Sequence, residues 1–126
     1  ENEIKFTGRI PFEQISENFN KADVLVNISE YESFGVSVIE AMSCGKPVIV
    51  TDVGGLAEIV ENESVGIKVE VRNIDQAADA MFKLSSDKNL YNTISQNGRQ
   101  LVLEKYNWKN NLSNMISIYK RTLELK

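Results

Sequence analysis

The fold is decided by residues 23–50, which read DVLVNISEYESFGVSVIEAMSCGKPVIV. Residues 23–28 are nearly all apolar and largely β-branched, which is typical of a strand buried on both faces. A polar, acidic stretch follows, and apolar residues at helical spacing then extend from Phe34 to about Ser43. Gly45 and Pro47 end this helical pattern, and residues 48–51 form a second buried apolar run. The order strand, helix, strand predicts a pair of parallel strands joined by a helix.

The same alternation continues on both sides of this stretch. The further elements are expected as strands at residues 4–6 and 66–71 and as helices at 11–21, at 56–61, from 74, around 90–102 and from 108. The apolar stripe on the last helix, which contains Trp108, Met115 and Tyr119, is expected to lie partly in the core and partly on a surface that contacts another domain. These elements predict one α/β domain, a Rossmann-like parallel sheet with flanking helices and a helical C-terminal tail.

Composition narrows the classes of function. The chain has 126 residues, with 14 basic against 18 acidic side chains and a net charge of −4, which argues against a nucleic-acid-binding surface. Its apolar runs are too short to cross a membrane. A cytoplasmic location is expected, with peripheral membrane association through another domain as the alternative. There is one cysteine, Cys44, and no histidine, so the commonest metal ligand and general base is missing. No metal site is expected.

The candidate functional residues lie between Glu32 and Glu40. They follow a buried strand and open a helix, which is where open parallel sheets bind ligands. A helix N-terminus offers free amides and a partial positive charge, and Gly35 lets a diphosphate approach those amides. Glu40 is placed to accept hydrogen bonds from a ribose diol. The alternative is that both acidic residues lie on an ordinary helix surface, where the helix dipole favours Glu32.

The surroundings favour the functional interpretation, because they resemble the GT-B-fold retaining glycosyltransferases of the "glycosyl transferases group 1" family. Five blocks match in order and at the expected spacing. They are residues 4–8 (family pattern v-x-F-x-G), residues 22–26 (aDvfv), residues 32–49 (E-x-F-G-x-x-x-x-E-A-M-A-x-G-x-P-V-I), Gly54-Gly55 with Glu58 (GG-x-x-E) and the aromatic pair around Tyr106-Asn107-Trp108.

The resemblance implies a transferase of the hexosyltransferase type with a nucleotide-sugar donor, such as a UDP- or GDP-sugar, and with no metal or other cofactor. It implies that Glu40 holds the ribose hydroxyls and that amides around Phe34, Gly35 and Val36 meet the diphosphate. Glu32 would contact the donor sugar near the reacting centre, either as a nucleophile or as a stabilising charge. The base would lie against Gly8 and Arg9.

The chain also departs from the family pattern. An upstream Arg and Lys that bind the diphosphate, two strands of the sheet and the N-terminal domain that binds the acceptor are not in this sequence. We therefore expect residues 1–126 to be part of the C-terminal, donor-binding domain of a two-domain enzyme, inactive alone. The strand at 4–6 should then pair beside residues 24–28, or the open sheet edge should cause self-association.

Three alternatives remain at this point. The first is a stand-alone nucleotide-binding or regulatory module of the same fold. The second is a nucleotide-sugar epimerase, which the lack of histidine disfavours. The third is a phosphoacceptor receiver domain with Asp52 at a strand end, which lacks the paired acidic residues expected after the first strand.

Overall fold

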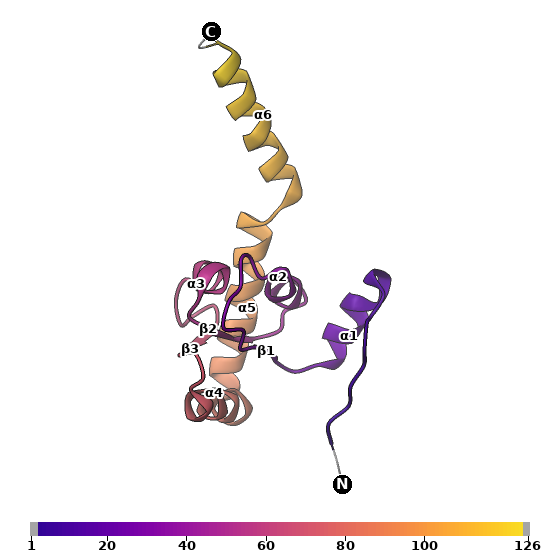
Figure 1. Ribbon diagram of the computed structural model, residues 1–126, viewed down its shortest axis with the longest axis vertical. Helices are drawn as coiled ribbons and strands as arrows, with labels where there is room; N and C mark the ends of the chain where they lie inside the picture. The colour runs from indigo at the N-terminus through magenta and orange to yellow at the C-terminus, as the bar shows by residue number, and fades with distance from the viewer. Residues whose placement is uncertain (1–2, 125–126) are drawn as a thin grey trace.

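The computed structural model describes residues 3–124 (Figure 1). Its elements follow in the order η1 (Phe12–Gln14), α1 (Ile15–Lys21), β1 (Leu25–Asn27), α2 (Val36–Ser43), β2 (Val48–Thr51), α3 (Gly54–Ile59), β3 (Ile67–Val69), α4 (Ile74–Ser86), α5 (Lys88–Lys105) and α6 (Trp108–Glu124). The three strands form one parallel sheet in the order β1-β2-β3, with Leu25 opposite Val48 and Ile49 opposite Ile67. The expected α/β architecture with a helical tail is confirmed.

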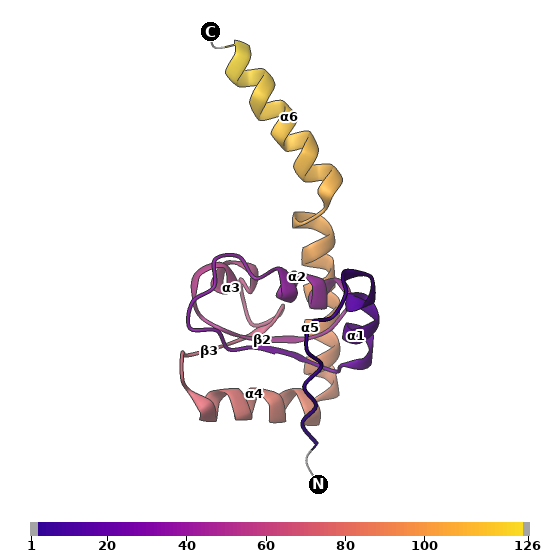
Figure 2. The same ribbon diagram turned by 45° about the vertical axis from the view of Figure 1, so that its right-hand side comes forward.

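The sheet lies between two layers of helices (Figure 2). One apolar cluster fills the space between the sheet, α2, α3 and α5, and a second joins the sheet to α4 and α5. All four residues of β2 are buried, as the unbroken apolar run predicted. The prediction that residues 23–28 form a strand buried on both faces is wrong, because β1 is at the sheet edge and its residues are exposed or only partly buried. Gly98 of α5 is also buried, and a methyl group there would lie 3.2 Å from the carbonyl oxygen of Val65. Close packing of α5 on the domain therefore explains a glycine inside a helix.

The prediction of a strand at residues 4–6 is wrong. The described segment before η1 forms no strand, and Ile4 and Phe6 are 76% and 94% exposed. The pairing of this segment beside residues 24–28 is therefore also wrong. An extended segment becomes a strand only when a neighbour takes its backbone hydrogen bonds, and β1 has one described partner, β2. The outer edge of β1 is open.

The prediction that α6 contributes to the core is wrong as well. Every described residue of α6 is exposed, and the helix extends away from the sheet (Figure 1). Helix α5 ends at Lys105, and the side chain of Asn107 accepts hydrogen bonds from the amides of Lys109 and Asn110. Asn107 thus starts a new helix, as predicted, but in a direction that leaves its apolar stripe unpacked.

Within residues 3–124, no helix has the combination of length and apolar character that a bilayer crossing requires.

Candidate functional site

The centre of the site is the N-terminus of α2, which lies at the carboxyl end of β1. Gly35 is the N-cap residue, with φ 92° and ψ 47°, a left-handed conformation that favours glycine. It is buried, and a methyl group there would lie 2.8 Å from Cδ2 of Leu56 and 3.2 Å from Cδ1 of Ile59. This position therefore favours glycine, and it lies at the helix start as expected, although α2 begins at Val36 and not at Phe34 as predicted.

Residues 29–33, called the acidic loop below, connect β1 to α2. The Glu32 carboxylate folds back towards the helix start, where Oε1 accepts a hydrogen bond from the Phe34 amide (3.4 Å). Glu32 also lines an open hollow of about 600 Å³ with the neighbouring residues Glu30, Tyr31, Ser33, Val53 and Gly54. A carboxylate and the free amides of a helix N-terminus thus lie at one end of the sheet, which is an arrangement suited to a polar ligand.

The glycine pair at the start of α3 fixes the position of this loop. The amide of Gly55 donates to the carbonyl oxygen of Glu32 (3.1 Å). A methyl group on Gly54, whose φ is 41°, would lie 2.1 Å from that oxygen, and one on Gly55 would lie 2.5 Å from the Cα of Phe34. The sequence left open whether these glycines serve a ligand or a tight turn. In the structure they allow two stretches of backbone to approach each other.

The base of the loop is held by two polar side chains that sequence reasoning did not single out. Thr51, which is 1% exposed, donates its hydroxyl to the carbonyl oxygen of Ser29 (2.5 Å). The side-chain oxygen of Asn27 accepts from both the amide (3.2 Å) and the hydroxyl (2.8 Å) of Ser29. A polar residue at the end of each of these two strands was the signal, because a hydroxyl or amide that is buried or partly buried needs a partner.

Glu40 lies further along α2 and faces a different hollow. That hollow, of about 290 Å³, is formed mainly by η1 and α1, with Phe12, Ile15 and Phe19 among its lining residues. Glu32 and Glu40 therefore lie on one helix and its leading loop but line two separate hollows. A single ligand that contacts both must extend along the N-terminal half of α2.

The structure separates Gly8 and Arg9 from the acidic loop. Both are exposed in the segment before η1, which runs beside α1 (Figure 1). A methyl group on Gly8 would meet no atom within 4 Å.

Two exposed aromatic or apolar side chains flank Gly35. Phe34 is 50% exposed and meets the Tyr106 ring edge-on at 6.2 Å, while Val36 is 57% exposed. Burial raises the pKa of Tyr106, and Glu61 and Glu58 also raise this pKa, against the opposing effect of Lys105. Phe34 thus connects the helix start to the junction between α5 and α6.

Ion pairs reduce the negative charge around the loop. The Arg72 guanidinium donates to both carboxylate oxygens of Glu30, from Nε at 2.7 Å and from Nη2 at 2.8 Å. This hydrogen bonding raises the pKa of Arg72. Lys68 of β3 pairs with Asp52 at 3.1 Å. Within residues 3–124, no three Asp, Glu or Cys side chains are grouped so that they could hold a metal ion.

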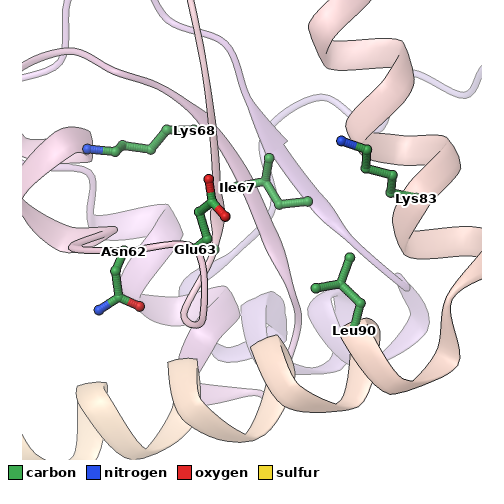
Figure 3. Close-up of a pocket in the computed structure, with 7 residues that line it drawn as sticks. Asn62, Glu63, Ile67, Lys68, Lys83 and Leu90 are labelled. Atoms are coloured by element: carbon green, nitrogen blue, oxygen red, sulfur yellow. The ribbon is translucent and has the colours of Figure 1, made fainter.

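Another hollow, of about 260 Å³, shares no lining residue with the hollow at the acidic loop (Figure 3). Glu63 and Ile67 lie between Lys68 on one side and Lys83 on the other. Gly66 and Ile67 lie where β3 begins, so this hollow is towards the amino ends of the strands. Ligands of open parallel sheets bind at the carboxyl ends, so the acidic loop is the better candidate.

Comparisons with known proteins identify a family. The model of the family "Glycosyl transferases group 1" matches residues 1–101. The chain is 36% identical, over 98% of its length and 32% of the relative's, to an uncharacterised glycosyltransferase of Methanocaldococcus jannaschii. It is 31% identical to N-acetyl-alpha-D-glucosaminyl L-malate synthase of Bacillus anthracis, over 94% of this chain and 31% of that protein.

Solved structures agree with the fold. Sucrose-phosphate synthase of Thermosynechococcus elongatus superposes with a TM-score of 0.88 and 34% identity, over 97% of this chain and 31% of the other. The Anabaena protein HepE, in complex with UDP and glucose, has a TM-score of 0.88 and 24% identity, over 96% of this chain and 33% of HepE. The chain thus spans about a third of the length of these proteins. The motifs at the start of α2, the family model and these similarities together establish that the chain belongs to the glycosyl transferases group 1 family.

Proposed function

We propose that this chain is the donor-binding part of a retaining glycosyltransferase of the hexosyltransferase type, which moves a sugar from a UDP- or GDP-sugar to an acceptor. The observation that carries the proposal is the buried, left-handed Gly35 at the N-terminus of α2, with the Glu32 carboxylate folded over that terminus. The amides of Phe34, Gly35 and Val36 would meet the diphosphate there. The UDP-glucose complex of HepE, a protein of the same fold, supports this class of donor.

The two acidic residues would act at different parts of the donor. Glu32 lines the open hollow at the end of the sheet and would contact the sugar, as a nucleophile or as a charge that stabilises an oxocarbenium-like transition state. Glu40 lies further along the helix towards α1 and would accept hydrogen bonds from the ribose. This order along α2 matches the order sugar, diphosphate, nucleoside in the donor. The base would then approach Gly8 and Arg9, on the side of the molecule where α1 lies.

The remainder of the enzyme is also part of the proposal. A further domain would supply the acceptor site, and basic residues outside this chain would bind the diphosphate. Because no described basic residue lies at the α2 N-terminus, residues 1–126 alone should have no transferase activity. Their affinity for the donor should be on the order of 1 mM, or about −4 kcal/mol.

Saturation-transfer NMR of the 126-residue chain with UDP-glucose and GDP-mannose tests this function. We expect signals from the sugar and ribose protons of at least one donor. Glu32→Gln should weaken the sugar signals, and Glu40→Gln should weaken the ribose signals. Glu104→Gln on α5 is the matched control, because Glu104 pairs with Gln100 of the same helix. Equal signals in all four proteins would contradict the proposed site. Dissociation constants in the low micromolar range would contradict the need for basic residues outside this chain.

We also propose that the open edge of β1 allows self-association. Val26 at this edge is 36% exposed, and Ile28 just beyond the strand is 57% exposed. Exposed apolar edges of this kind favour pairing between copies. Sedimentation velocity should therefore show a concentration-dependent increase in mass, which Val26→Lys reduces. A monomer across the whole concentration range would disprove this part of the proposal.

A further inference from the structure

Arg72 has an unusual backbone conformation. Its φ is 62°, and among residues 3–124 it is the one residue other than glycine in the left-handed region. An L side chain is disfavoured there, and such residues persist where surrounding contacts hold them. Arg72 lies between β3 and α4, at the same end of the sheet as the acidic loop.

The turn that carries Arg72 is fixed by hydrogen bonds on both sides. The amide of Asn73 donates to the carbonyl oxygen of Glu70 (3.2 Å), and the Asn73 side chain donates to the Glu70 carboxylate (3.0 Å). The amide of Glu70 in turn donates to the side chain of Gln76 in α4 (2.7 Å). Asn73 also caps α4. The guanidinium of Arg72 is therefore presented from an ordered support.

The partner of Arg72 lies in the middle of the acidic loop. Both ends of this loop are already held, Ser29 by Thr51 and the Glu32 backbone by Gly55. Glu30 lies between Ser29 and Glu32, and Arg72 donates two hydrogen bonds of 2.7 and 2.8 Å to the Glu30 carboxylate. A bidentate guanidinium–carboxylate pair restricts orientation as well as distance, which is unusual for an exposed ion pair.

The same contact changes the charge at the site. Glu30 and Glu32 line the same hollow, so two acidic residues lie near any ligand there. Arg72 offsets one of them and leaves Glu32 as the uncompensated charge. An anionic ligand at the α2 N-terminus would otherwise meet repulsion from both.

We propose that Arg72 is a positioning residue, which fixes the acidic loop through Glu30 and lowers the negative charge that a sugar diphosphate meets. The positioning of the loop concerns the chain without ligand. The effect on the charge that a sugar diphosphate meets rests on the proposed function.

The test uses the 126-residue chain, without ligand, and two variants that break the pair from opposite sides. Arg72→Gly removes the guanidinium and suits the left-handed backbone, and Glu30→Gln removes the charge with little change of shape. Lys105→Ala is the matched control, because Lys105 of α5 forms another exposed ion pair, with Glu61 in the loop after α3. The ¹⁵N relaxation of residues 30–33 and the solvent exchange of the Arg72 Nε–H are measured, together with urea unfolding.

We expect order parameters of residues 30–33 to fall from about 0.85 to below about 0.6 in both variants. The Arg72 Nε–H should exchange about tenfold faster in Glu30→Gln. The unfolding midpoint of Arg72→Gly should equal or exceed that of the wild type, which separates loss of loop order from loss of stability. Lys105→Ala should leave the loop unchanged.

An ordered loop in Arg72→Gly would overturn the inference, because Arg72 would then not be needed to fix the loop. Disorder in Arg72→Gly but not in Glu30→Gln would also overturn it, because the effect would then not pass through Glu30. A UDP-glucose titration follows as a separate step. We expect binding to weaken about fivefold in Arg72→Gly. A wild-type chain that binds no nucleotide-sugar would count against the proposed function and would leave the result on loop order intact.

Discussion

Replacing Gly55 by alanine should both destabilise the domain and displace the acidic loop. The added methyl group would lie 2.5 Å from the Cα and from the carbonyl oxygen of Phe34. These atoms belong to the backbone, so no rotamer change relieves the overlap. Ordinary contact begins at 3.4 Å. The two backbones must therefore separate by the difference, about 0.9 Å.

This movement has a cost that can be estimated. Overpacking of a buried site costs about 1–3 kcal/mol. The hydrogen bond from the Gly55 amide to the Glu32 carbonyl, now 3.1 Å, would stretch beyond normal range and remove about 1 kcal/mol more. We expect the free energy of unfolding to fall by roughly 2–4 kcal/mol, which corresponds to a Tm lower by about 10 °C.

Urea unfolding followed by circular dichroism measures the stability, and amide chemical shifts of residues 30–34 report the displacement. Gly66→Ala is the control, because the three atoms nearest to its methyl group would be side-chain carbons of Val48 and Val60, at 2.9–3.0 Å. That variant should lose stability without moving the loop. If Gly55→Ala unfolds within about 0.5 kcal/mol of the wild type and keeps its loop shifts, the close approach described for this glycine is refuted.

Three further outcomes are expected. Gly35→Ala should lower the free energy of unfolding by more than about 1 kcal/mol in denaturant titrations, because φ at Gly35 is 92° and the added methyl group would meet Leu56. A smaller loss would contradict the left-handed conformation at the helix start. Burial, and secondarily the charge of Asp23, raises the pKa of Tyr91, so the contribution of Tyr91 to stability is complete below about pH 10 and is lost at higher pH. Tyr91→Phe should reduce this alkaline loss of stability in unfolding curves taken at a series of pH values. An unchanged loss would show that Tyr91 is not its source. Met115→Gln on α6 should change thermal stability by less than about 0.5 kcal/mol, because α6 packs against no core residue; a larger loss would show hidden packing.

The site was partly predictable because its most important feature is local. A helix that follows a strand through a glycine puts its amides at the sheet end wherever the rest of the chain lies, and Gly35 is indeed the N-cap residue. The positions of Glu32 just before α2 and of Glu40 within it follow from the same helix start. That they line different hollows does not follow, because each hollow is completed by a distant segment, around Val53 for one and around Phe12 for the other.

The sequence by itself determined the alternation of most strands and helices, the helix start near Gly35 and the break before α6, since each depends on side-chain periodicity and backbone preferences within a few residues. Tertiary structure alone decided whether the segment before η1 forms a strand, where α6 points, why Gly54 and Gly55 are needed and which cation neutralises Glu30. Arg72 and Glu30 are 42 residues apart, and their meeting depends on parallel strands bringing distant loops to one edge. A hydrogen-bonded strand or a buried helix face requires a partner, and no local pattern specifies where that partner lies.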